Sequence, residues 1–305
     1  MTGTGALAAS WPGILAHGFF RNAAAAGALT AVAAGLAGWF VVTRNQVFAA
    51  DALSHVALTG GVGALAYGLG AGVGVYGGTV VLAVVLGLAG SRAARAGDTV
   101  TGIVFAWVLG LGAYFLSVLT GGGAGGDGAA AVRVLFGSVF GISGGQIRAT
   151  AWVAAVTIGG LLLVARPLLF STVDPDVARS QGVPVRFVEV AFLALLGLAV
   201  AQAVQVLGTL LVLALMATPA AIARHLTDRP WTGMWLSSAL AVTAVWAGLV
   251  ISYIRSDLPP SFVIVSLLVV AYLVAGLRVP NAVAGLRGPK AVAGLLSPRS
   301  GRSDR

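Results

Sequence analysis

Stretches of about 20 apolar residues recur along almost the whole chain, and they limit its possible folds more than any other feature. A helix of that length crosses the hydrocarbon core of a bilayer and satisfies its own backbone polar groups. The sequence therefore predicts an all-α, polytopic transmembrane helical bundle of about eight or nine spans. We place nine spans at residues 19–43, 50–69, 73–90, 99–119, 149–169, 187–203, 205–223, 234–254 and 262–277.

Charged residues are scarce, and this excludes several classes of function. Only 9% of the residues are charged and 58% are hydrophobic, whereas an average soluble protein is about 25% charged. So few charges cannot solvate a soluble enzyme or bind nucleic acid. The sequence contains no cysteine, no G-x-x-x-x-G-K-[ST] phosphate loop and no H-E-x-x-H pair. We therefore expect no enzymatic activity and no permanently bound cofactor, so active transport would draw its energy from a partner or an ion gradient.

The positions of the basic residues predict the orientation of the spans, because positively charged loops stay in the cytoplasm. With nine spans and an external N-terminus, 14 of the 18 basic residues fall on the inner side. The remaining four lie on the outer side, and they are Arg21, Arg133, Arg148 and Arg255. The predicted topology is thus N-out and C-in.

The connections and the C-terminal end complete the predicted organisation. Residues 120–130 are Gly-rich and predict a flexible outer loop, and residues 131–148 predict a short outer or re-entrant helix. Residues 1–277 are expected to form one transmembrane domain. Residues 278–305 carry six basic residues and one acid, and they predict a disordered cytoplasmic tail near anionic membrane lipid.

Asp51 and His55 lie in the second predicted span, where ionisable residues are costly and usually functional. Their i, i+4 spacing places both side chains on one helical face. A carboxylate and an imidazole can share a divalent cation, and a two-fold dimer would supply two of each. In the alternative interpretation, Asp51 caps the N-terminus of the span and His55 bonds to it. From the spacing alone, the two interpretations have roughly even weight.

The longest polar inner loop, residues 171–186, contains signals for a short helix. Asp174 and Asp176 flank a proline, as at many helix starts, and Gly182 is a typical helix end. The predicted helix therefore covers about 174–183. It is either an ordinary interfacial helix or a docking element. Glu189, in the sixth span, is expected to pair with Arg186 because i, i+3 residues share a helical face.

Five stretches match a known family in order and spacing. They are Phe19-Phe20-Arg21-Asn22-Ala23, Asp51-Ala-Leu-Ser-His55-Val-Ala-Leu-Thr-Gly60, Asp176-Val-Ala-Arg-Ser-Gln-Gly182-Val, the segment 206–224, and Ile251-Ser-Tyr253 with Asp257-Leu-Pro259. Together they resemble the membrane permease subunit of bacterial metal-ion ABC importers of the zinc, manganese and sometimes iron class. The chain departs from the family pattern at Ala50, at Thr59 and at residues 260–262.

This resemblance implies a type II ABC importer permease that works as a homodimer in the bacterial inner membrane. Asp51 and His55 match the metal-pathway positions of the family, which favours the ligand interpretation. Asp176, Arg179 and Gly182 match the coupling helix that docks on the ATPase. The outer arginines Arg21 and Arg255 are expected, from their position, to hold an external binding protein.

The resemblance also implies partners and a cargo. Two copies of a separate ABC ATPase would dock on the cytoplasmic face, and an external metal-binding lipoprotein or periplasmic protein would deliver the ion. The expected cargo is Zn²⁺ or Mn²⁺, with Fe²⁺ as a further candidate, and it would bind only transiently. The alternative functions are an ion-gradient-driven secondary transporter and a non-metal or non-transporting member of the same family.

Overall fold

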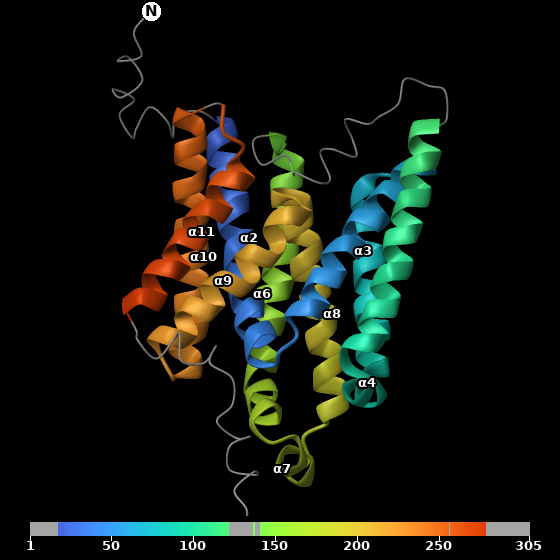
Figure 1. The fold of residues 1–305 in the computed structure, drawn as a ribbon, viewed down its shortest axis with the longest axis vertical. Coiled ribbons are helices and arrows are strands. Elements are labelled where there is room, and N and C mark those ends of the chain that lie inside the picture. Colours follow the sequence, from blue (N-terminus) through green and yellow to red (C-terminus); the bar gives the residue numbers. More distant parts are fainter. Residues whose placement is uncertain (1–17, 122–136, 138–140, 256, 279–305) are drawn as a thin grey trace, which may run out of the picture.

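A computed structural model describes residues 18–121, 137, 141–255 and 257–278, and in these ranges it consists of helices joined by short connections, with no strand. The helices stand roughly side by side as a bundle (Figure 1). Most of the predicted tail and of the Gly-rich loop at 120–130 lies outside the described residues. The helices are α2 Gly18–Thr43, α3 Val47–Ala66, α4 Ala71–Gly121, α6 Gly144–Val173, α7 Pro175–Ser180, α8 Val185–Leu207, α9 Thr209–Leu226, α10 Pro230–Ile254 and α11 Pro260–Arg278.

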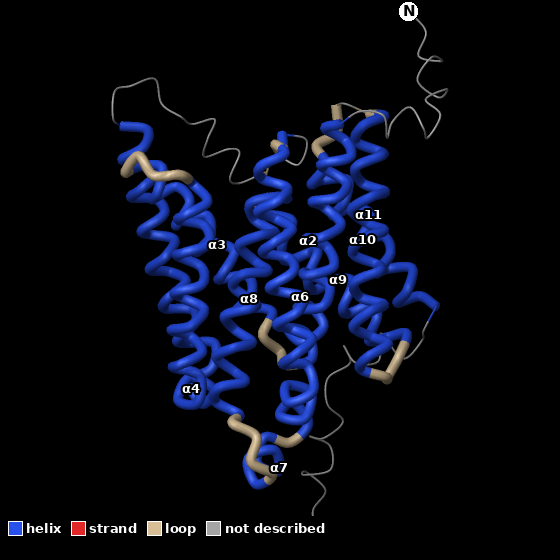
Figure 2. Tube along the Cα trace, turned by 180° about the vertical axis from the view of Figure 1, so that it is seen from behind, coloured by secondary structure: helices blue, strands red, loops and turns tan. Residues whose placement is uncertain are grey.

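Within the described ranges, nine stretches are long and apolar enough to cross a membrane, and the predicted all-α fold is confirmed. Two of them, Ala71–Leu88 and Gly102–Leu119, belong to α4. A straight helix of the 51 residues of α4 would be about 76 Å long, far more than the bilayer core of about 30 Å. Instead α4 doubles back near the end where α7 lies, and its two legs run antiparallel (Figures 1 and 2).

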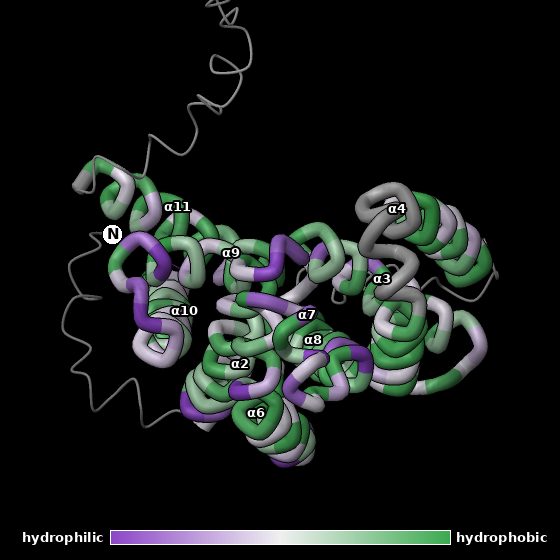
Figure 3. Tube along the Cα trace, turned by 90° about the horizontal axis from the view of Figure 1, so that it is seen from below, coloured by the Kyte–Doolittle hydropathy of each residue, from purple (hydrophilic) through white to green (hydrophobic). Residues whose placement is uncertain are grey.

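The centre of the bundle is formed by α2 and α8, which are the most buried spans in the described structure. Phe40 of α2 meets Phe192 of α8 edge to face, with ring centroids 5.9 Å apart. The second leg of α4 and helix α11 are the least buried spans, and they expose large apolar side chains such as Trp107 and Leu277. Viewed from the α7 end, hydrophilic residues lie mainly around α7 and at helix ends (Figure 3). This distribution suits lipid around the bundle.

Glycines let α3 and α4 approach closely, a common device in membrane helices. A Cβ added at Gly60 or at Gly74 would overlap the backbone carbonyl of the other residue. The backbone of α3 at Gly60 therefore lies directly against the backbone of α4 at Gly74. The same pair of helices is joined by Thr59, whose hydroxyl donates a hydrogen bond of 3.2 Å to the carbonyl of Val108. Helix α3 continues through Thr59, one of the positions where the chain departs from the family pattern.

The predicted short helix over 131–148 is wrong in its described part. Helix α6 begins at Gly144, where the Ser143 side chain and Gln146 form a capping box, so residues 144–148 are the first turn of a span. Residues 131–136 lie outside the described ranges. Gly137 has a φ of +72°, and an added Cβ would lie 2.5 Å from the carbonyl carbon of Leu207. Gly137 therefore packs on the break between α8 and α9.

Candidate functional site

Asp51 and His55 project from the same side of α3, and the position of the helix start decides between their two interpretations. Helix α3 begins at Val47 and its N-cap position is Gln46, so Asp51 lies more than one turn inside the helix. The N-cap interpretation of Asp51 is therefore wrong. Both side chains are partly exposed, and the His55 ring meets Phe105 of α4 edge to face at 5.1 Å.

The Asp51 carboxylate and the His55 imidazole have no hydrogen-bond partner among the described side chains. The Ser54 hydroxyl bonds to the backbone carbonyl of Asp51, at 2.7 Å, and leaves the carboxylate free. No group of three or more His, Asp or Glu residues that could hold a metal occurs in the described part of the chain. One copy of this chain thus offers one hard oxygen ligand and one imidazole nitrogen at this place, which is an incomplete coordination shell.

The short helix predicted over about 174–183 is present as α7, and its ends follow from local sequence signals. The Asp174 carboxylate accepts hydrogen bonds of 3.0 Å from the amides of Asp176 and Val177, and Pro175 occupies the first turn. At the other end Gly182 has a φ of +82°, and the Val183 amide bonds back to Ala178. Helix α7 is shorter than the predicted 174–183 because these capping residues flank it.

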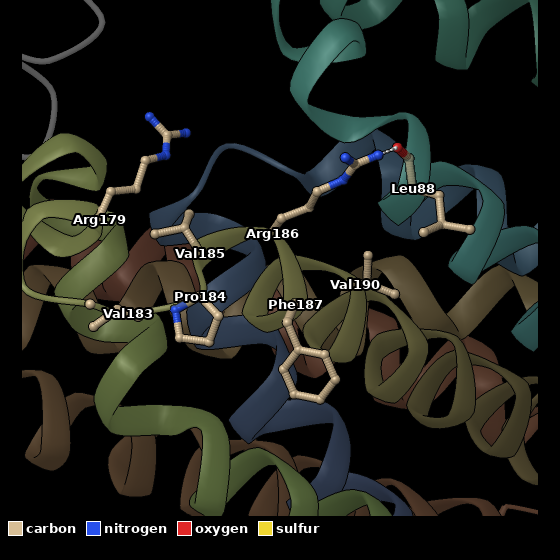
Figure 4. A pocket seen from close by; sticks show the side chains of 9 residues that line it. Leu88, Arg179, Val183, Pro184, Val185, Arg186, Phe187 and Val190 are labelled. Atoms are coloured by element: carbon tan, nitrogen blue, oxygen red, sulfur yellow. Dashed lines mark hydrogen bonds between the residues drawn. The ribbon is translucent and has the colours of Figure 1, made fainter.

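Two of the three residues predicted for coupling line a cavity of about 690 Å³ at the α7 end of the bundle. Arg179 and Gly182 stand at its α7 side, and Arg186 donates a hydrogen bond of 3.4 Å across it to the carbonyl of Leu88 in α4 (Figure 4). Asp176 pairs with Arg179 at 2.6 Å, with both side chains largely exposed. The other lining residues are Val183, Pro184, Val185, Phe187 and Val190.

Arg44 forms a polar cluster that the sequence did not reveal. Its guanidinium lies 4.0 Å from the Glu189 carboxylate, donates a hydrogen bond of 3.1 Å to the Thr172 hydroxyl, and stands 5.9 Å from the centre of the Phe192 ring. The predicted Arg186–Glu189 pair is therefore wrong. Glu189 faces the largely buried Arg44, whose charge needs a carboxylate, whereas Arg186 is exposed and reaches α4 instead. Burial lowers the pKa of Arg44, and the Glu189 charge opposes that shift.

At the opposite end of the bundle, Arg21 and Arg255 are both exposed on helix ends that lie together. Phe20 of α2 packs edge-on against Tyr253 of α10, with ring centroids 5.6 Å apart. This contact brings the start of α2 beside the end of α10. A cavity of about 490 Å³ opens at the same place, lined by Phe19, Ser252, Tyr253, Asp257, Leu258, Pro259 and Pro260.

Comparison with known proteins assigns this bundle to a class. The ABC 3 transport family matches residues 16–278. The chain is 30% identical over 243 residues to the manganese transport system membrane protein MntC of Halalkalibacterium halodurans, covering 79% of this chain and 81% of that protein. It is 28% identical to the chelated iron transport system membrane protein YfeD of Yersinia pestis, covering 78% of each.

A solved structure, PsaBC from Streptococcus pneumoniae in complex with Fab, has the same fold with a TM-score of 0.74 and 25% identity. The match covers 87% of this chain and 93% of that one. The fold, its apolar spans and these matches therefore define a multi-pass permease of the bacterial plasma membrane, of the ABC transporter type. The chain belongs to the ABC 3 transport family, and the resemblance to permeases of metal-ion ABC importers is confirmed.

Proposed function

We propose that this chain is the permease subunit of an ATP-driven importer of divalent transition-metal ions, with Mn²⁺ as the first candidate cargo. The observation that carries the proposal is the Asp51–His55 pair, one carboxylate and one imidazole on one face of a membrane-spanning helix, with no hydrogen-bond partner among the described side chains. Relatives named for manganese transport and for chelated iron transport support a metal cargo. A hard oxygen and a borderline nitrogen suit Mn²⁺, Fe²⁺ and Zn²⁺ alike.

A homodimer completes the metal site in this proposal. Two copies of the chain together supply two Asp51 carboxylates and two His55 imidazoles, which is a sufficient first shell for a divalent ion. Each copy alone holds the ion weakly, so separation of the two helices releases it. Such a site binds the ion during passage and does not store it.

ATP hydrolysis is assigned to a separate ATPase, of which two copies dock on the α7 side of the dimer. Asp176, Arg179 and Gly182 belong to the contact, because α7 projects beyond the spans and is held rigidly by its caps. The cavity beside α7 extends this contact surface. With the N-terminus outside, the α7 face is cytoplasmic, and the metal moves inward.

An external metal-binding protein delivers the ion at the opposite end. Arg21 and Arg255 are exposed guanidinium groups on adjacent helix ends, and they suit acidic side chains of such a partner. Closure of the ATPase dimer moves the α7 helices, the spans rearrange, and the Asp51–His55 pairs pass the ion from the outer to the inner side.

Metal uptake by cells tests this proposal. Variants D51A and H55A each remove one ligand while keeping the helix, and changes to outer-shell groups alone often cost about 10–100-fold in metal affinity. We expect uptake of radioactive Mn²⁺ to fall at least tenfold at an unchanged membrane level. The control is H225Q, on a histidine that packs against Tyr272 at the far end of α9. Normal uptake by D51A and H55A would exclude Asp51 and His55 as ligands.

The energy source separates this proposal from a secondary transporter. Uptake should disappear when the ATPase subunit is absent and should survive collapse of the proton and sodium gradients by ionophores while ATP is maintained. Uptake without the ATPase that follows an ion gradient would assign the chain to the secondary-transporter class.

A further inference from the structure

We propose that Arg44 is a positioning residue that links the α6–α7–α8 segment to α3, the helix that carries Asp51 and His55. The inference rests on the proposed function, because it explains how movement of α7 reaches the metal pair. It concerns a side chain outside the Asp51–His55 pair, the α7 docking segment and the outer arginines.

Arg44 sits in a short, closed turn between α2 and α3. Its amide bonds to the carbonyl of Phe40 at 2.9 Å, and the Gln46 amide bonds to that of Val41 at 2.8 Å. Between them Asn45 adopts a φ of +54°, a left-handed conformation that asparagine tolerates better than most residues. Helix α3 starts directly after this turn. A displacement of Arg44 therefore passes to α3 and is not absorbed by a flexible loop.

The Arg44 side chain contacts both helices that flank α7. Thr172, which accepts its hydrogen bond, lies in the last turn of α6 just before α7. Glu189 forms the ion pair with the Arg44 guanidinium, and the ring of Phe192 lies under that guanidinium. Both residues lie in the first turns of α8, just after the α7 loop. One guanidinium thus touches the chain on each side of the predicted coupling helix. The lower ends of these helices stand next to the α7 loop in the bundle (Figure 2).

The burial of the cluster makes this link stiff. The Arg44 side chain is 14% exposed and that of Glu189 is 19% exposed, so separating them would leave two poorly hydrated charges. The Nε of Arg44 has no partner among the described groups, so its two Nη atoms carry both polar contacts. When α6 and α8 move with α7, Arg44 must follow, and α3 moves with it.

One double variant, R44M/E189M, separates a positioning role of Arg44 from a purely structural one. If the ion pair only stabilised the fold, this variant would keep normal coupling of transport to ATP hydrolysis. Well-packed apolar residues often replace a buried ion pair with little or no loss of stability. R44M/E189M should therefore fold and assemble with the ATPase, while it loses the directional contacts to Thr172 and to α8. The single variant R44K retains a charge for Glu189 but lacks the planar fork that also reaches Thr172. It should lie between the wild type and the double variant.

The test uses the complete transporter, the full-length permease purified with its ATPase and reconstituted in vesicles with the binding protein. We expect R44M/E189M to assemble and hydrolyse ATP, while the Mn²⁺ transported per ATP hydrolysed falls by about tenfold. The matched control is R224M, because Arg224 also bonds to the end of α2, at the carbonyl of Val42, but to neither α6 nor α8 in the described contacts. It should keep the normal ratio. A normal ratio in R44M/E189M would overturn the link.

A second readout does not depend on the cargo. The chain has no cysteine, so F48C introduces a single thiol at a partly exposed residue in the first turn of α3. ATP should change the rate at which a maleimide labels this thiol, and the change should be lost in R44M/E189M. An equal response in both backgrounds, or no response in F48C alone, contradicts the link. A wild-type complex that moves no metal refutes the proposed function, whereas the labelling result still decides the role of Arg44.

Discussion

The Gly60–Gly74 crossing allows a direct test of how the position of α3 controls function. In G60A, the added Cβ would stand 3.0 Å from the carbonyl carbon of Gly74 and closer still to its oxygen. Carbon atoms pack best at about 3.5–4.0 Å, so α3 and α4 must separate by about 0.5–1 Å at this point. The obstacle is backbone, which cannot turn away as a side chain can.

The expected cost follows from two opposing effects. Overpacking costs about 1–3 kcal/mol, and the backbone contact favours the upper end of that range. Replacing a mid-helix glycine by alanine returns about 0.5–1 kcal/mol. The net loss for G60A is therefore about 2 kcal/mol, which corresponds to about 4–8 °C in Tm for a large domain. G77A, one turn after Gly74 in α4, has open space around its added Cβ and should be neutral or stabilising.

Two measurements check this prediction. Thermal unfolding of the purified permease should place G60A below the wild type and G77A at or above it. Mn²⁺ uptake should fall in G60A, because a shift of α3 displaces the Asp51–His55 pair, and should be normal in G77A. Equal Tm values and equal uptake in the two variants would refute the argument that this glycine contact sets the position of α3.

Three further changes have defined outcomes. G182A places a Cβ at a φ of +82° and should cost about 1–2 kcal/mol locally, which weakens co-purification of the ATPase with the permease; unchanged co-purification would contradict this role. T59V removes the hydrogen bond to Val108 and should lower the Tm by an amount equivalent to about 1 kcal/mol, and an unchanged Tm would show that the bond adds no stability. R21E/R255E should slow association of the binding protein in a salt-dependent way without changing the Tm, as measured by surface plasmon resonance, and an unchanged rate would exclude both arginines from the contact.

The spans could be predicted from sequence because their signal is local. A bilayer requires about 20 apolar residues in a row, and each such run is visible without knowledge of its neighbours. Helix α7 could be predicted for the same reason, since Asp174, Pro175 and Gly182 each act on the backbone within a few residues. The orientation of the bundle, its dimerisation and the roles of the candidate site residues remain predictions.

The choice between the cap and ligand interpretations of Asp51 depended on a small error in the predicted start of the second span. The sequence placed the second span at 50–69, whereas α3 covers Val47–Ala66. This difference moves Asp51 from a capping position to the interior of the helix. Hydrophobicity does not fix the residue at which a helix starts. Here the start of α3 is set by the turn Arg44–Gln46, which backbone hydrogen bonds close, and amino-acid composition does not predict such bonds.

The Arg44 cluster could not be predicted, because its members are far apart in the sequence. The i, i+3 rule favoured Arg186 as the partner of Glu189, but that rule describes residues on an exposed helix surface. Glu189 instead faces the bundle, where Arg44 arrives from another helix. In the sequence, Arg44 is one of the basic residues assigned to the inner side that predict the topology. The only local signal for this cluster was that Arg44 directly follows a span and that the polar Gln46 comes two residues later.

The energetics of this cluster also indicate where the bundle can bend. Separating Arg44 from Glu189 would leave two poorly hydrated charges, so the ends of α2, α6 and α8 nearest α7 resist separation. At the opposite end of α8, by contrast, the helix stops at Gly208, which has a φ of +90°, and α9 begins directly after it. The amide of Gly208 is bonded back into α8, while Gly137 packs on the break. Rearrangement of the spans should therefore be concentrated around this break, while the α7 end moves as one unit that carries α3 with it.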